Sequence, residues 1–192
     1  MTTALVPRPI AWVGTRSASG VDNLAPFSYF MGVSTTPLLV AFSAARLRDG
    51  ARKHTAQNLL DTGVCTISIP EQADLDAMHA SSAAWQDSEF DALGLPRAEG
   101  AVVGAPRPAQ ARVAMEGRLH QHLDLAQADL VLVEVLRFHV DDTLWKNDRV
   151  DPHAFDPVAR LGGEFYASLG ARHARAPATV AAPPAPAAPR KD

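Results

Sequence analysis

Four consecutive side chains, Arg52-Lys53-His54-Thr55, carry more potential chemistry than any other short segment of the chain. They follow Asp49-Gly50, which indicates a turn, and they lie in a stretch with helical spacing. Cations at the start of a helix oppose the helix dipole, which favours anions there. A bound anion removes this conflict, because free backbone N–H groups, the cations and the Thr55 hydroxyl can all contact it. The segment therefore predicts a phosphate site or, equally well on local grounds, a solvated basic turn.

A second polar segment runs from Asn23 to Phe30 and contains Pro26 and Ser28. Proline removes one backbone N–H group and fixes the local backbone, so that neighbouring amides and the Ser28 hydroxyl are free to pair with a ligand. We interpret the segment as a loop that leads into a strand. On its residues alone, an ordinary turn at the start of a strand explains it better than a binding site does.

The remaining reactive side chains form no catalytic pattern. His120 and His122 share a strand face, but no third ligand at metal-binding spacing accompanies them, so we expect surface residues and no metal. The serines lack a Gly-x-Ser-x-Gly context, which argues against a hydrolytic triad. Cys65 falls in a predicted core strand, where cysteine acts as a small hydrophobic side chain. The carboxylates between Asp87 and Asp91 are expected to be solvated in a loop.

Short strands dominate the elements that would position these residues. Period-two or apolar runs predict strands over residues 10–15, 27–33, 38–43, 64–69, 113–123 and 130–140, the last buried on both faces. Helical spacing is clearest over residues 51–62, where Gly63 provides the stop, and a second helix is expected near residues 73–80. Many short antiparallel strands with one or two helices predict a closed or partly closed β-barrel.

Length and composition limit the class of protein. With 192 residues, 47% hydrophobic and 20% charged, the chain suits one globular domain, which we place at residues 1–173. Residues 174–192 are nearly all Ala and Pro with a basic end, and we expect a disordered tail there. The net charge of -3 gives no reason to expect a nucleic-acid partner. One cysteine, no apolar span and no signal peptide predict a soluble cytoplasmic protein with no membrane partner.

Ordered blocks along the chain resemble the flavin reductase-like domain family, which includes flavoredoxins and the reductase components of two-component monooxygenases. The first block is Pro7-Arg8-Pro9-Ile10-Ala11-Trp12-Val13-Gly14-Thr15, followed by residues 23–30. The pattern continues through Val33-Ser34, Phe42-Ser43, Arg52-Lys53-His54-Thr55 with Asn58, Thr62-Gly63, residues 78–82, residues 89–95, and residues 157–163 with Tyr166. These blocks keep the family's order, and the ordered set carries the resemblance.

The resemblance implies a fold that is mainly β with a few helices: a split β-barrel of antiparallel strands that forms a homodimer with FMN near the subunit interface. Asn23 to Ser28 would line the ring and ribityl part of the flavin, and Ser43, Arg52, Lys53 and Thr55 would surround its phosphate. The segment around Ser82, together with Arg160, would approach the flavin from the same subunit or its partner. The residues assigned to the cofactor are Thr15, Asn23, Leu24, Ala25, Pro26, Phe27, Ser28, Ser43, Arg52, Lys53, Thr55, Ser82 and Arg160.

Three departures from the family pattern accompany the resemblance. His54 stands where relatives usually have Asp, which keeps the predicted phosphate site cationic, and His79 stands where Asn is common. The chain also reaches its first predicted strand sooner than relatives usually do. This predicts either a mis-assigned start site or a missing edge element, in which case the barrel is less well covered at that end.

The function implied by the resemblance is hydride transfer from NAD(P)H to FMN. The flavin carries this reaction, so no acid–base triad and no catalytic residue are expected. A partner monooxygenase or another acceptor would receive the electrons. Three alternatives stay open: an FMN-dependent oxidoreductase that acts on another small molecule, an electron carrier similar to flavoredoxins with little nicotinamide activity, and a barrel that does not bind flavin.

Overall fold

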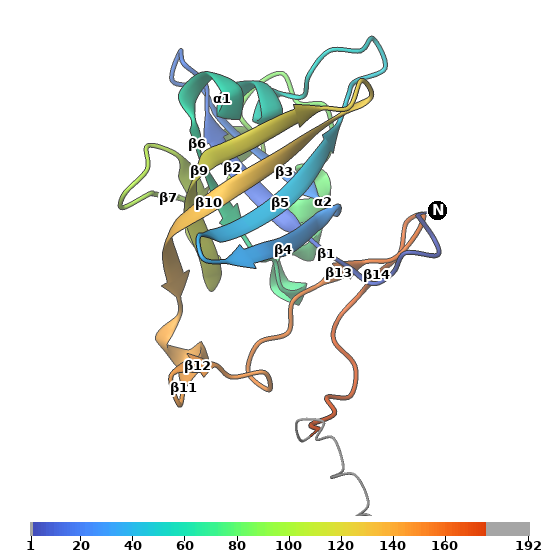
Figure 1. The fold of residues 1–192 in the computed structure, drawn as a ribbon, viewed down its shortest axis with the longest axis vertical. Helices are drawn as coiled ribbons and strands as arrows, with labels where there is room; N and C mark the ends of the chain where they lie inside the picture. The colour runs from blue at the N-terminus through green and yellow to red at the C-terminus, as the bar shows by residue number, and fades with distance from the viewer. Residues whose placement is uncertain (1, 176–192) are drawn as a thin grey trace, which may run out of the picture.

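Residues 2–175 are described by a computed structural model, in which a curled antiparallel sheet is accompanied by short helices (Figure 1). The Ala- and Pro-rich segment predicted as a tail lies outside the described residues, apart from Ala174 and Arg175, which are exposed. Within residues 2–175, no helix is long and apolar enough to cross a membrane.

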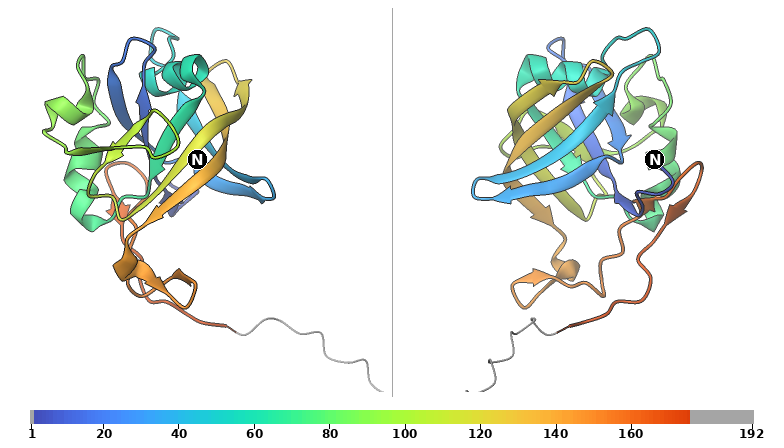
Figure 2. Two further views of the ribbon diagram at one scale, coloured as in Figure 1. Left: turned by 90° about the vertical axis from the view of Figure 1, so that its left-hand side faces the viewer. Right: turned by 45° about the vertical axis from the view of Figure 1, so that its right-hand side comes forward.

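Seven strands form the main sheet in the order β3-β2-β6-β9-β10-β5-β4, and every neighbouring pair is antiparallel. The edge strands β3 and β4 follow each other in the chain without pairing, and the sheet curls into a barrel (Figure 2). This arrangement confirms the prediction of a mainly β, split-barrel fold with antiparallel strands. The bounds are β2 Ala11–Arg16, β3 Asp22–Phe27, β4 Phe30–Thr35, β5 Leu38–Ala45, β6 Val64–Ser68, β9 Val113–Asp124 and β10 Ala128–Val140.

Short helices and three small separate sheets accompany the main sheet. The α-helices are α1 His54–Thr62, α2 Leu75–Ala80 and α3 Glu89–Ala92, and 3-10 helices span Gln72–Asp74 and Asp142–Leu144. Two short hairpins pair β7 Arg97–Glu99 with β8 Pro106–Pro108, and β11 Trp145–Lys146 with β12 Arg149–Val150. A three-stranded sheet of β1 Arg8–Pro9, β13 Ala159–Arg160 and β14 Tyr166–Ala167 brings distant parts of the chain side by side (Figure 1).

Strand β2 lies at the centre of the hydrophobic core, because both of its faces are buried. Val13 belongs to a cluster inside the barrel with Phe42 of β5 and Leu59 of α1. Trp12 points to the other face, into a second cluster with Met78 of α2 and Phe90 of α3. The alternation of a strand therefore attaches α1 to one side of the barrel wall and α2 with α3 to the other. As predicted, Cys65 is buried, and burial raises the pKa of its thiol to about 12.

Helix α1 begins three residues later than predicted, at His54 rather than at residue 51. The preceding turn explains the delay: Gly50 has a positive φ, the Ala51 N–H donates to Asp49, and the Ala51 carbonyl accepts from the Leu47 N–H. Arg52 and Lys53 therefore precede the helix instead of occupying its first turn. The predicted stop at Gly63 is confirmed by its left-handed conformation at the helix C-terminus.

Three predictions about strands need correction. Residues 23–27 form strand β3 rather than a loop, and the predicted strand over residues 27–33 is interrupted at Ser28 and Tyr29. Pro26 fits within β3 because β3 is an edge strand, where a missing N–H group breaks no ladder. Strand β10 buries one face only: its residues alternate between buried and half-buried positions up to Val135.

Candidate functional site

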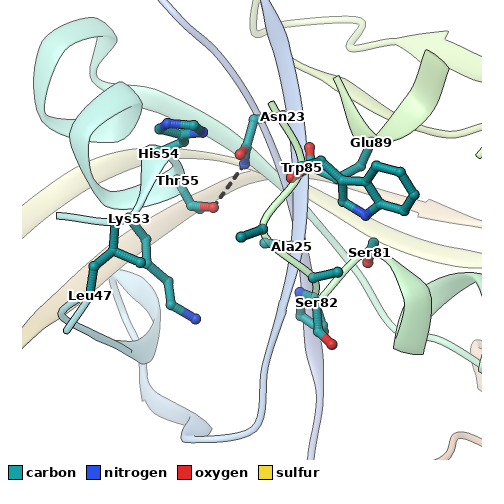
Figure 3. A pocket seen from close by; sticks show the side chains of 13 residues that line it. Asn23, Ala25, Leu47, Lys53, His54, Thr55, Ser81, Ser82, Trp85 and Glu89 are labelled. Atoms are coloured by element: carbon teal, nitrogen blue, oxygen red, sulfur yellow. Dashed lines mark hydrogen bonds between the residues drawn. The ribbon is translucent and has the colours of Figure 1, made fainter. Parts of the chain in front are cut away.

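An open pocket of about 170 Å³ lies between β3, the start of α1, and the segment that joins α2 to α3 (Figure 3). The pocket is lined by Asn23, Ala25, Pro26, Leu47, Lys53, His54, Thr55, Ser81, Ser82, Ala83, Ala84, Trp85 and Glu89.

The start of α1 gives one end of this pocket an anion-attracting character. Lys53 is the N-cap residue in an extended conformation, and its side chain makes no capping hydrogen bond. The first turn of α1 contains no acidic residue, so nothing on the helix itself neutralises its positive end. The Lys53 ammonium lies 5.7 Å from the centre of the Phe27 ring, beside the pocket. One end of the pocket therefore combines the free backbone N–H groups of α1 with the side chains of Lys53 and His54.

Buried amide and hydroxyl groups hold β3 against α1. The Asn23 side-chain amide donates to Thr55 Oγ1 at 2.8 Å (Figure 3) and to Thr15 Oγ1 at 3.4 Å. Asn58 also donates to Thr15 Oγ1, at 3.1 Å. Thr15 thus lies behind the pocket and positions Asn23, which lines it.

The free edge of β3 faces the pocket. Some of the backbone groups that point away from the sheet at this edge already have hydrogen-bond partners. The Leu24 N–H donates to Glu89 Oε2 at 2.8 Å. Because outward and inward backbone groups alternate along an antiparallel strand, Pro26 also points outward, where it offers a carbonyl and no N–H. The edge therefore offers acceptors more readily than donors, in contrast to the free amides expected from the sequence.

Glu89 is the clearest functional candidate that the sequence analysis missed. It was expected to be solvated, but it is only 6% exposed and lies in α3 at the wall of the pocket. Burial raises the pKa of Glu89, whereas the hydrogen bond from Leu24 opposes that shift. The sequence feature that could have indicated the burial of Glu89 is the neighbouring Phe90. Phe90 is buried in the second hydrophobic cluster and so holds the short helix against β3.

Six of the predicted site residues line the pocket: Asn23, Ala25, Pro26, Lys53, Thr55 and Ser82. Leu24 and Phe27 are buried in the two hydrophobic clusters. Ser43 lies on β5, and its N–H donates to the Tyr29 carbonyl. Leu47 and Trp85 also line the pocket but were not predicted; the Trp85 indole donates to the Ala80 carbonyl at 3.0 Å.

Three further predicted residues point to other partners. Arg52 forms ion pairs with Asp124 and Asp129, each at 3.1 Å. Ser28 Oγ accepts a long hydrogen bond of 3.4 Å from Arg8 Nε. Arg160 contacts Tyr166 and the Gly163 carbonyl. No group of metal-ligating side chains occurs among the described residues.

Comparisons with known proteins identify the family and the fold of the chain. The sequence model of the flavin reductase like domain family matches residues 3–154. An uncharacterised protein of Halalkalibacterium halodurans is 31% identical over 175 residues, which cover 87% of this chain and 84% of the relative.

Solved structures extend the comparison to three dimensions. Nitrilotriacetate monooxygenase component B of Bacillus cereus has a TM-score of 0.84 at 30% identity, over 90% of this chain and 89% of that one. A split barrel domain protein of Shewanella frigidimarina has a TM-score of 0.81 at 27% identity, over 93% and 89% of the two chains. The flavoredoxin of Desulfovibrio vulgaris shares the fold, with a TM-score of 0.77 at 24% identity over 88% and 91%.

Proposed function

This chain belongs to the flavin reductase-like domain family, and we propose that it binds FMN in the pocket of Figure 3 and passes a hydride to it from NADH or NADPH. The observation that carries the proposal is the uncompensated positive end of α1, with Lys53 beside it, at one end of the pocket.

The phosphate end of FMN fits the start of α1. A dianionic phosphate is stabilised there by the helix dipole, by the N–H groups of the first turn and by the Lys53 ammonium. Thr55 and His54 add polar groups at the same wall. His54 in place of the family's usual acidic residue removes a repulsive charge, so the site accepts phosphate without a counter-charge on the helix.

The ring end of FMN fits the other walls. Ala25, Pro26, Ala83 and Ala84 offer small apolar surfaces, and the Pro26 carbonyl can accept from a ring N–H. FMN, when bound, supplies the two-electron chemistry. The side chains of this chain bind it, orient it through the Asn23–Thr55 pair, and require no proton-transfer triad.

The proposal extends to assembly and partners. We place the protein in the cytoplasm as a homodimer, because a single buried cysteine suits a reducing compartment and strand β10 keeps a half-buried apolar face. Likeness to a monooxygenase component supports a monooxygenase as the acceptor of its electrons.

The first experiment titrates the purified full-length chain with FMN and measures binding by the change in flavin fluorescence. Lys53→Ala should raise the dissociation constant at least tenfold, roughly the loss expected for one charge-assisted contact. Lys146→Ala is the matched control, because Lys146 lies in the exposed β11–β12 hairpin. Equal dissociation constants for wild type and Lys53→Ala would contradict the proposed phosphate site.

A second experiment separates the reductase from an electron carrier, which the shared fold with a flavoredoxin keeps as the second candidate. FMN-loaded protein is mixed anaerobically with NADH or NADPH while the visible absorption of the flavin is followed. Rapid bleaching by either nucleotide supports the reductase. Bleaching by dithionite but by neither nucleotide supports the carrier and rejects the reductase.

A further inference from the structure

A second cationic cluster lies where β1 pairs with β13. The register places Arg8 directly opposite Arg160, so their side chains share one face of the sheet, where like charges repel. The Arg8 guanidinium lies 5.6 Å from the centre of the Tyr29 ring, and the Arg160 guanidinium lies 4.5 Å from that of Tyr166. His79 of α2 approaches the Tyr166 hydroxyl at 3.0 Å. We call these five residues the Arg8–Arg160 cluster.

Neither arginine of this cluster pairs with a carboxylate among residues 2–175, unlike Arg16, Arg52 and Arg97. Arg8 is only 7% exposed and donates to the carbonyls of Thr2 and Leu5 and to Ser28. Arg160 donates to a hydroxyl and a carbonyl. Burying a charge without a counter-charge is unfavourable, so two guanidinium groups on one face leave a positive potential that an anion would neutralise.

Two of the chain segments that form or contact this cluster also line the pocket of Figure 3. Ser28, which accepts from Arg8 Nε, follows the end of β3 and lies two residues beyond Pro26, which lines the pocket. Along α2, the His79 carbonyl accepts from the hydroxyl of Ser82, another lining residue, at 2.6 Å. The cluster is therefore adjacent to the end of the pocket formed by Pro26 and Ser82, whereas Lys53 belongs to the start of α1.

We propose that the Arg8–Arg160 cluster is a second anion-binding site, which takes a carboxylate or phosphate group of the molecule that exchanges electrons at the pocket. The identity of that molecule rests on the proposed function, but the anion site itself does not. A planar guanidinium held over an aromatic ring presents its remaining N–H groups to an oxyanion in a fixed plane. Arg160 then contacts the second substrate rather than the flavin.

The test follows the thermal unfolding midpoint of the full chain with increasing sodium phosphate or sodium benzoate, at constant ionic strength kept with sodium chloride. A ligand that binds only the folded state raises the midpoint, which yields its dissociation constant. We expect at least one of the two anions to stabilise the wild type. Arg160→Gln should raise that dissociation constant at least about tenfold, the equivalent of one lost charge-assisted contact.

Arg149→Gln is the matched control, because Arg149 is an exposed arginine in a different hairpin and forms no ion pair within the described chain. It should respond as the wild type does. A response to phosphate alone that Lys53→Ala retains assigns a phosphoryl group to the ligand of the cluster, and a response to benzoate alone assigns a carboxylate. No response to either anion, or an unchanged constant in Arg160→Gln, overturns the proposal.

Two further variants distinguish a failed anion site from a failed flavin site and from a variant that does not fold. Lys53→Ala should retain the response of the cluster even where it loses FMN binding, so a failed flavin site and a failed anion site give different results. If Arg160→Gln does not fold, Arg160→Lys keeps the charge but loses the planar fork. The same tenfold weakening then supports the site, and an unchanged constant overturns it.

Discussion

Neighbouring residues of the same charge have different roles in this protein. Arg52 turns toward Asp124 and Asp129, whereas Lys53 lies at the pocket. Asp129 is only 1% exposed, and its carboxylate also accepts from Arg46 and lies 2.7 Å from His122. This network joins β9 and β10 to the turn before α1. Arg52 therefore positions the segment that carries Lys53, and the resemblance alone could not separate the two cations.

This difference gives a prediction for paired variants. Arg52→Ala should lower the free energy of unfolding by about 1–2 kcal/mol, because it removes a partly buried partner of a buried carboxylate. Its effect on the FMN dissociation constant should be smaller than that of Lys53→Ala. Urea unfolding and flavin titration of both variants measure the two quantities. A larger loss of FMN affinity in Arg52→Ala than in Lys53→Ala would show that Arg52 is itself the main phosphate contact.

At the level of elements, one buried carboxylate of β9 holds the loop between β7 and β8. Glu116 is fully buried and accepts from the backbone N–H groups of Ala101, Val102 and Val103 at 2.7–2.9 Å. His139 of β10 lies 2.5 Å from the same carboxylate. Burial by itself would raise the pKa of Glu116, but the hydrogen bonds from His139 and the loop outweigh it and lower the pKa to about 2.

The lowered pKa predicts an acid-dependent stability. A carboxyl whose pKa is lower in the folded state stabilises the fold above its unfolded pKa of 4.5, and this contribution is lost as the pH falls toward 2. The unfolding free energy of the wild type should therefore decrease over this interval by about 3 kcal/mol more than that of Glu116→Gln. Urea unfolding at several pH values measures the slopes. Parallel slopes would mean that Glu116 is not ionised in the folded loop contact.

At the level of the whole molecule, the barrel buries only one face of its longest apolar strand. Val131 and Val133 of β10 point into the core, and Leu132 between them is half-buried on the outer face. Leu132 and the 61% exposed Met31 of β4 both pair with Ala41 of β5, so they share that outer face. A second copy of the chain that packs on this face would bury both faces of the strand, as its sequence predicts.

The proposed homodimer can be tested by light scattering after size-exclusion chromatography. The wild type should have twice the chain mass of 20.4 kDa. Leu132→Asp should give a monomer, because a charge at a dry interface remains unpaired. Leu169→Asp is the control, since Leu169 is exposed outside the sheet. A dimer that persists in Leu132→Asp would place the interface elsewhere, and a monomeric wild type would reject the assembly.

The sequence by itself determined the strand-rich fold, the stop of α1 at Gly63, and the family, because these depend on local patterns and on ordered motifs. It also identified three segments of the pocket wall, around Asn23, Lys53 and Ser82. That these residues contact FMN stays a prediction. The predicted tail lies outside the described residues, apart from Ala174 and Arg175.

Only the tertiary structure decided what each basic and acidic side chain of those segments contacts. The reason is that these contacts join residues far apart in the sequence. Gly14 is a simple example of such a contact: a Cβ there would lie 2.0 Å from the Pro106 carbonyl oxygen. In the same way, Arg52 pairs with Asp129 of β10, and Glu89 accepts from the Leu24 N–H, which the edge strand β3 leaves without a strand partner. The sequence shows the charge of each side chain, but the residue with which that side chain pairs lies in another element, and only the fold brings the two together.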